Sequence, residues 1–112
     1  MKIAIPLHQG NLSMHFGHCE HFALVEVDEQ KKTILGESLH QPPPHEPGVL
    51  PRWLGELGAN LIIAGGMGRR AQELFASNNI AVMVGAQGNS PQQLVAAYLS
   101  GTLETGENCC DH

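Results

Sequence analysis

The chain has 112 residues, of which 42% are hydrophobic, 15% charged and 4% aromatic, a composition that suits one globular domain and argues against disorder. Six basic residues against eleven acidic ones give a net charge of −5, which disfavours nucleic-acid binding and a polybasic membrane anchor. No apolar run approaches the roughly 20 residues that span a bilayer.

The N-terminus and the cysteine count bear on the cellular compartment and on the redox state of the thiols. The first apolar stretch ends at Pro6 and polar residues follow it, so we predict no signal peptide and expect a cytoplasmic protein. Three cysteines are an odd number and two of them are neighbours, which argues against a disulfide framework. Reduced thiols are then available as metal ligands or redox groups.

The first third of the chain is typical of a β-hairpin preceded by a strand. Residues 3–7 predict a short buried strand, and residues 8–18, rich in glycine and histidine, predict a loop. Apolar and polar side chains alternate from about residue 20 to 28, which predicts a second strand. A polar turn at 29–32 leads to an expected antiparallel strand at 33–38.

A proline-rich segment separates this hairpin from a helical region. Four prolines between residues 40 and 48 exclude a helix or a central strand, so we expect an extended loop. We expect this loop to connect two layers of the fold rather than to cover a site. Apolar residues then recur at helical spacing from Val49 to Leu57, and Gly58 is a suitable terminator. Residues 61–64 predict a buried strand.

The remaining elements alternate between helix and strand. Ala71, Leu74 and Phe75 form the inner stripe of a second helix that ends at residues 78–79, and residues 80–84 predict a further strand. Ser90 and the residues up to Gln93 form a capping box that opens a third helix closed at residue 101.

Helix-linked strands imply parallel pairing, whereas the hairpin implies antiparallel pairing. We therefore predict an α/β fold: a mixed sheet of about five strands with about three helices on its two faces. The predicted domain covers residues 1–101, and residues 102–112 are expected to form a flexible tail.

A dense group of metal-ligating side chains follows the first strand. Three imidazoles and one thiol fall within seven residues, namely His15, His18, Cys19 and His21. Imidazole suits several transition metals and thiolate favours soft ions such as Cu(I) and iron–sulfur chemistry. On a strand, Cys19 and His21 would share one face and His18 the other, unless Gly17 bends the chain. Alternatively, some of these histidines only form hydrogen bonds in a loop.

The C-terminal tail holds a second group of ligands. Cys109, Cys110, Asp111 and His112 could complete a metal site, act as a weak scavenging tail, or have no function. No Cys-x-x-Cys pair is present, so the usual signals of structural zinc and of thioredoxin-like proteins are missing. His8, His40 and His45 are expected in scattered loops.

Two glycine-rich segments each follow a predicted strand. Gly65, Gly66 and Gly68 precede Arg69 and Arg70 at the start of a helix, where free N–H groups favour an anion. The spacing weakly matches a dinucleotide fingerprint, but no acidic residue between 74 and 103 could take a ribose hydroxyl. A smaller anion, or simply a tight turn that needs glycine, fits better.

The second glycine-rich segment, residues 85–89, follows the next parallel strand. Loops at the carboxyl ends of parallel strands line one crevice, so this segment should neighbour residues 65–70. If residues 15–21 reach the same edge, soft ligands and anion-binding amides meet there. An anionic metal–sulfur species would satisfy both, whereas a bare cation would need only the ligands.

Enzyme signatures are sparse. The acidic residues Glu20, Glu26 and Asp28 lie on or beside one predicted strand, whereas a two-metal nuclease needs carboxylates from several strands. Cys19 with a neighbouring histidine could form a thiol nucleophile, although closeness in sequence does not establish that geometry.

The two glycine- and histidine-containing motifs resemble a known family. Ser13-Met14-His15-Phe16-Gly17-His18-Cys19, then Gly65-Gly66-Met67-Gly68-Arg69-Arg70-Ala71, and a glycine loop before the last helix are similar to the dinitrogenase iron–molybdenum cofactor biosynthesis family, which includes nitrogenase-accessory-factor-like and orange-protein-like members. The resemblance covers residues 1–101. It implies a ribonuclease-H-like fold without nuclease activity, and a role in binding or carrying metal–sulfur clusters or their precursors.

The sequence thus leads to the hypothesis of a non-enzymatic carrier or assembly protein for a metal–sulfur cluster of Mo–Cu–S or Fe–Mo–S type. Its partners would be the anionic cargo and the cluster-assembly or recipient proteins. The expected cluster-binding residues are His15, Phe16, Gly17, Gly65, Gly66, Gly68, Arg69 and Arg70. The expected metal ligands are His15, His18, Cys19, His21, Cys109, Cys110 and His112. The alternatives are a single-ion metal chaperone or sensor, a thiol enzyme using Cys19, and a regulatory module without cargo.

Overall fold

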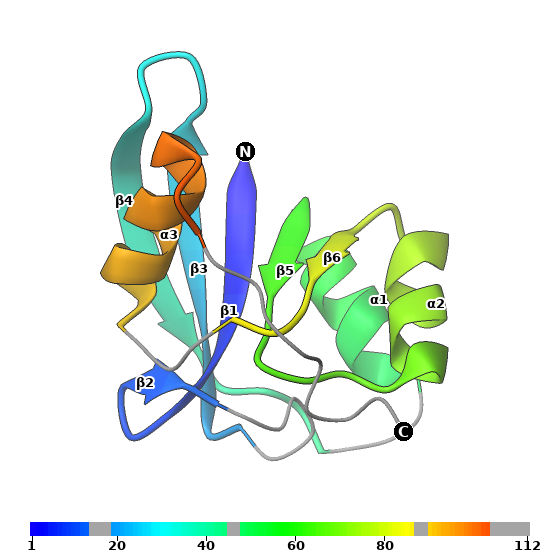
Figure 1. Ribbon diagram of the computed structural model, residues 1–112. Helices are drawn as coiled ribbons and strands as arrows, with labels where there is room; N and C mark the ends of the chain where they lie inside the picture. Colours follow the sequence, from blue (N-terminus) through cyan, green and yellow to red (C-terminus); the bar gives the residue numbers. More distant parts are fainter. Residues whose placement is uncertain (14–18, 45–47, 87–89, 104–112) are drawn as a thin grey trace.

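The computed structural model describes residues 1–13, 19–44, 48–86 and 90–103, and it has one mixed sheet with helices on both faces (Figure 1). Along the sheet the strands follow the order β4-β3-β1-β5-β6, with the short β2 paired to β1. The α/β class predicted from the sequence is therefore confirmed, as is the placement of helices on both faces.

The antiparallel half of the sheet comes from the N-terminal third of the chain. It consists of β1 (Lys2–His8), β2 (Asn11–Leu12), β3 (His21–Asp28) and β4 (Thr33–His40). Strand β3 pairs antiparallel with both β1 and β4, as the hairpin pattern predicted. The turn before β4 is held by Asp28, whose Oδ1 accepts the backbone N–H groups of Gln30 and Lys31 at 3.0 and 3.1 Å.

Two expectations for this region were wrong. The segment 8–18 was predicted to be a loop, but His8 still belongs to β1 and Asn11–Leu12 forms β2. Gln9 and Gly10 have φ angles of 54° and 84° and make a two-residue turn between β1 and β2. Gly10 signals such a turn, but a glutamine at positive φ does not follow from its propensity. The strand expected at 33–38 continues to His40.

The parallel half comes from the rest of the chain. It contains α1 (Val49–Glu56), β5 (Leu61–Ile63), α2 (Arg69–Ser77), β6 (Ala81–Met83) and α3 (Pro91–Ser100). Strand β5 pairs parallel with β1 and with β6, so β1 is the strand where the two halves meet.

The predicted helix signals are present in the structure. Ser90 Oγ accepts the N–H of Gln93 at 3.3 Å and the Gln93 side chain accepts the N–H of Ser90 at 3.4 Å, which completes the capping box of α3. Gly58 and Gly101 adopt left-handed φ angles of 91° and 76° just after α1 and α3. These positions favour glycine because it has no Cβ.

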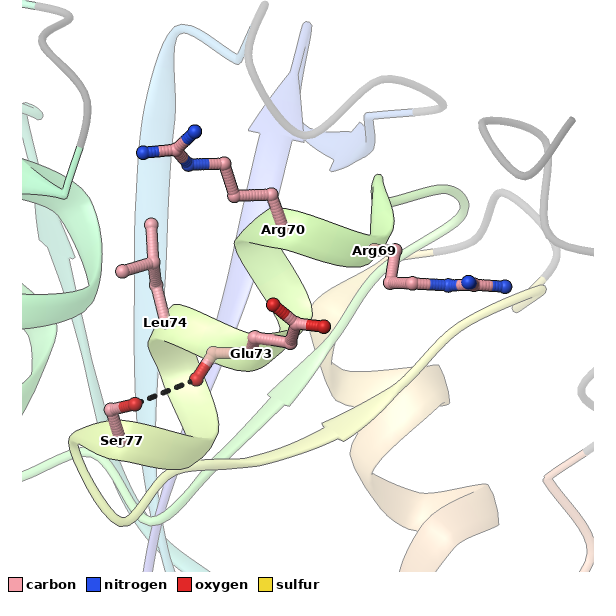
Figure 2. Close-up of a pocket in the computed structure, with 5 residues that line it drawn as sticks. All are labelled: Arg69, Arg70, Glu73, Leu74 and Ser77. Carbon is pink, nitrogen blue, oxygen red and sulfur yellow. Dashed lines mark hydrogen bonds between the residues drawn. The ribbon is translucent and has the colours of Figure 1, made fainter.

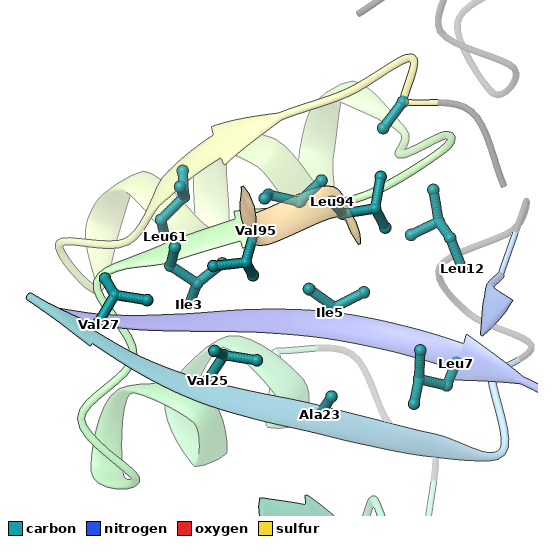
Figure 3. Close-up of a cluster of buried hydrophobic side chains, with 12 residues drawn as sticks. Ile3, Ile5, Leu7, Leu12, Ala23, Val25, Val27, Leu61, Leu94 and Val95 are labelled. Carbon is teal, nitrogen blue, oxygen red and sulfur yellow. The ribbon is translucent and has the colours of Figure 1, made fainter. Parts of the chain in front are cut away.

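The sheet separates two apolar cores. On one face α3 covers a cluster formed mainly by β1 and β3 (Figure 3); its buried members are Ile3, Ile5, Leu7, Leu12, Ala23, Val25, Val27, Leu61, Ile63, Ala86, Leu94 and Val95. On the other face α1 and α2 cover Ala4, Phe22, Leu24, Leu50, Leu54, Ala59, Ile62, Ala64, Met67, Phe75 and Ile80. Alternation along the strands sends neighbouring residues to opposite cores.

Within the residues described, no helix is long and apolar enough to cross a membrane. The predicted boundary between the domain and its tail, at residues 101 and 102, stays a prediction. Leu103 packs against the core on the α3 face. Residues 104–112 lie outside the described part.

Candidate functional site

The candidate site lies at the edge of the sheet where the parallel strands β1, β5 and β6 end. Because these strands run in the same direction, their carboxyl ends and the loops that follow them lie side by side at one edge. The antiparallel neighbour β3 begins at this edge, since Leu7 is the register partner of His21. Strand β4 ends there, because Phe22 is the partner of His40.

The glycine loop that begins at Gly65 and the one that begins at Gly85 are neighbours, as the sequence predicted. The N–H of Gly85 donates to the carbonyl of Gly65 at 3.0 Å, and the N–H of Ala86 donates to Ala64 at 3.3 Å. Gly65 is buried, so its backbone is part of the packed structure. Residues 87–89 of the second loop lie outside the described part. The backbone of the two loops is thus joined directly after β5 and β6.

Helix α2 begins directly after the first glycine loop. Gly68 is the N-cap residue in an extended conformation, and no side chain caps the helix. The first turn has no acidic residue, so the exposed N–H groups keep their partial positive charge. The preceding Met67 is buried, and its carbonyl accepts a hydrogen bond from Gln72 Nε2 at 2.9 Å. The loop is therefore fixed before any anion binds.

Arg69 and Arg70 are exposed in the first turn of α2 but do not form one cationic clamp. Figure 2 shows their side chains leaving the helix in different directions. Together with Glu73, Leu74 and Ser77 they line a groove of about 580 Å³ along the outer side of the helix. The sequence predicted both arginines in the anion site; both lie in the first turn of α2, and their contact with an anion stays a prediction.

The described residues on either side of the His-Phe-Gly segment are hydrogen-bonded to this same edge. The N–H of Ser13 donates to the carbonyl of Pro6 at 2.9 Å, and the N–H of Glu20 donates to Leu7 at 2.8 Å. Residues 14–18, which include the predicted ligands His15, Phe16, Gly17 and His18, lie outside the described part. Their chain neighbours on both sides are therefore fixed to the last residues of β1.

Cys19 is half-buried and packs against the core under α1 and α2. Burial raises the pKa of its thiol to about 11, although a hydrogen bond from the backbone acts in the opposite direction. A nucleophilic cysteine needs a lowered pKa, because the thiolate is the reactive form. The environment of Cys19 therefore argues against the thiol-enzyme alternative. A metal ion could still displace the proton.

Cys19 and His21 do not share a face of the sheet. Cys19 precedes β3 and packs on the side of α1 and α2, whereas His21 opens β3 in phase with Ala23 and Val25, which belong to the core under α3. The expected grouping assumed that both residues lie on a strand. It fails because the strand begins only at His21, which is exposed to solvent.

The structure also brings two unexpected histidines to this edge. His8 ends β1 and His40 ends β4, so the expectation that both lie in scattered loops was wrong. The ring of His40 packs edge-on against Trp53 with centroids 6.4 Å apart, and its Nε2 lies 2.9 Å from Ser38 Oγ. Strand pairing is what places both histidines, and no local pattern in the sequence signals it. His45 lies outside the described residues.

No complete metal site exists among the described residues. Within 1–13, 19–44, 48–86 and 90–103, no group of three or more His, Cys, Asp or Glu side chains converges on one point. The predicted ligands Cys109, Cys110 and His112 lie outside these ranges. A metal held at this edge would therefore have to combine described side chains with others.

The chain is similar to known proteins over nearly its whole length. The family profile described as dinitrogenase iron–molybdenum cofactor matches residues 1–101. An uncharacterized protein of Methanocaldococcus jannaschii is 34% identical over 110 residues, which are 96% of this chain and 92% of that protein. Both glycine loops and the His-Phe-Gly segment fall within the matched range.

Solved structures share the architecture. The crystal structure of PH0822 has a TM-score of 0.85 at 30% sequence identity and covers 94% of each chain. The apo form of the orange protein from Desulfovibrio gigas has a TM-score of 0.72 at 20% identity, covering 96% of this chain and 93% of that one. This second likeness concerns the fold alone. The arrangement agrees with the ribonuclease-H-like fold implied by the sequence motifs.

Proposed function

The chain belongs to the dinitrogenase iron–molybdenum cofactor family, and from this premise we propose that it is a non-enzymatic carrier or assembly protein for an anionic metal–sulfur cluster or its precursor. The observation that carries the proposal is that groups suited to an anion and groups suited to a metal ion lie at the same edge of the sheet. The uncapped N-terminus of α2 offers amide groups for an anion, and Cys19 with both ends of the His-Phe-Gly segment lies at the end of the neighbouring strand β1.

A metal–sulfide anion needs both kinds of group. Its metal ions bind thiolate and imidazole, while its sulfide charge is balanced by N–H donors and a cation. A bare metal ion would use the ligands and gain nothing from the amides. The arrangement therefore supports a cargo of Mo–Cu–S or Fe–Mo–S type over a single ion.

We assign the direct metal contacts to His15 and Cys19, with His18 and the tail residues Cys109, Cys110 and His112 as further ligands. Phe16 and Gly17 would complete the wall of the site. The amides of Gly66 and Gly68 would face sulfide, and Gly65 supports them through its hydrogen bond with Gly85. One of Arg69 and Arg70 would supply the positive charge. We propose that the cargo passes to or from cluster-assembly or recipient proteins.

Reconstitution tests this proposal directly. Apo-protein is incubated anaerobically with tetrathiomolybdate and Cu(I), and in parallel with iron and sulfide, and metal-to-sulfur charge-transfer absorption is recorded after gel filtration. We expect an absorbing species that elutes with the wild-type protein. His15→Ala and Cys19→Ala should each lower the affinity of the protein for this species at least tenfold, since each removes a metal ligand.

The matched control is His40→Ala, which removes a histidine held by Trp53 and Ser38. Unchanged absorption in His15→Ala, in Cys19→Ala and after deletion of residues 104–112 would overturn the site. Bound metal without acid-labile sulfide would instead establish the single-ion chaperone or sensor. A protein that stays colourless and metal-free under every condition would indicate a regulatory module.

A further inference from the structure

His8 lies on the same side of the sheet as Cys19. Leu7 and Leu12 are register partners in β1 and β2, and both belong to the core under α3. Alternation therefore turns His8, the next residue, toward the face of α1 and α2, where Cys19 also packs. The imidazole of His8 and the thiol of Cys19 therefore lie at the same edge of the sheet and on the same face.

A carboxylate contacts the His8 ring. Glu20 Oε1 lies 3.3 Å from His8 Nδ1 and accepts the N–H of Gln9 at 2.8 Å. The N–H of Glu20 in turn donates to the carbonyl of Leu7 at 2.8 Å, so both ends of this residue are attached to the β1–β2 hairpin. Among the residues that the structure describes, His8 Nε2 has no hydrogen-bond partner.

The same carboxylate stabilises an unusual backbone. Gln9 has a φ angle of 54°, a left-handed conformation that residues with a Cβ seldom adopt. Its N–H is the group that Glu20 binds. A two-residue hairpin turn of this kind has positive φ at both of its residues, so the turn between β1 and β2 accounts for the angle. Glu20 thus contacts both the His8 ring and the backbone of the turn residue that follows it.

This arrangement is the one that metal-binding histidines commonly have. One ring nitrogen binds a carboxylate, which fixes the tautomer and the ring orientation, and the other nitrogen coordinates the metal. We propose that His8 is a further ligand for the metal of the cargo through Nε2, and that Glu20 is the positioning residue that orients its ring. The inference rests on the proposed function and adds a ligand to the same edge.

The test is an anaerobic titration with Cu(I) against a colorimetric competitor, using the full chain. We expect His8→Ala and Glu20→Gln each to weaken Cu(I) binding by about tenfold or more, because loss of a ligand or of its carboxylate has effects of this size. His40→Ala should bind as the wild type does. In the wild type, the Nε2 resonance of His8 should shift on addition of Cu(I) in long-range ¹H–¹⁵N spectra.

The outcomes separate this inference from the proposed function. If Cys19→Ala loses Cu(I) binding while His8→Ala and the His8 resonances are unaffected, His8 is not a ligand, and the reconstitution with tetrathiomolybdate and Cu(I) alone decides the carrier function. If His8→Ala weakens binding but Glu20→Gln does not, the positioning role of Glu20 is wrong. If the wild type binds neither Cu(I) nor tetrathiomolybdate, both proposals fail. Both side chains are exposed, and thermal unfolding by circular dichroism verifies that each variant is folded.

Discussion

At the scale of single residues, burial decides what Cys19 can do. Cys19 is partly buried against the apolar core under α1 and α2, so the neutral thiol is favoured and the pKa rises to about 11. An exposed cysteine beside three histidines would be a candidate nucleophile from sequence alone. A metal ion that binds this thiol has to displace its proton, so the affinity of Cys19 for a metal should rise with pH.

This pKa gives a pH dependence for alkylation. At pH 7 the thiolate fraction of Cys19 should be about a hundredfold below that of an unperturbed thiol, because the pKa is raised by about two units. The rate with iodoacetamide should therefore rise about tenfold per pH unit until the pH approaches about 11, the pKa of the folded thiol. Peptide mass mapping resolves Cys19 from the tail, and a Cys109→Ser/Cys110→Ser variant is the control. Rapid alkylation at neutral pH would revive the thiol enzyme.

At the scale of elements, the junction of the first glycine loop with α2 carries the anion-binding part of the site. Gly68 has ordinary extended φ and ψ angles of −65° and 156°, and a Cβ built there would meet no atom within 4 Å. Neither backbone conformation nor packing therefore requires glycine at this position. A tight turn that needs glycine therefore does not account for Gly68, and close approach of the proposed cargo at this position stays a prediction.

Gly68→Ala should separate stability from binding. We expect the free energy of unfolding to fall by about 1 kcal/mol, since alanine is a poorer N-cap than glycine. The affinity for tetrathiomolybdate–copper should fall by at least about tenfold, because the methyl group would occupy the space of the anion. Gly36→Ala is the matched control, as its Cβ also meets no atom within 4 Å and it lies in the middle of β4. Equal binding by both variants would exclude close contact at Gly68.

At the scale of the whole molecule, one sheet joins two cores. Strand β1 contributes Ile3 and Ile5 to the α3 side and Ala4 to the side of α1 and α2. Because both layers depend on the same central strand, neither can unfold without exposing apolar surface of the other. The domain should therefore unfold as a single cooperative unit.

Leu94→Ala tests this cooperativity. Leu94 is a buried residue of α3 that packs into the core between this helix and the sheet, so its truncation should lower the free energy of unfolding by about 2–5 kcal/mol. Trp53 lies in α1 on the opposite face, and its fluorescence should nevertheless report the same shifted urea midpoint as circular dichroism. The exposed Leu35→Ala is the control and should have little effect. Two separate transitions would show that the layers unfold independently.

The sequence by itself determined most of the elements and their order, with the short strand β2 as the exception. Strand alternation, the capping box at Ser90 and the glycine after α1 are local signals, because short-range sterics and hydrogen bonds act within a few residues. Through these signals the sequence also predicted that the loops at Gly65 and Gly85 are neighbours, since parallel strands end at one edge.

Only the tertiary structure decided which chemical groups meet. The sequence could not separate Cys19 from His21, because where β3 begins and which core Cys19 joins depend on packing against distant residues. It could not bring His8 to Glu20 or His40 to the same edge, since strand pairing sets these positions. Strand pairing and core packing join residues that are far apart in the sequence, so the ligand set of the site is a property of the fold rather than of any segment.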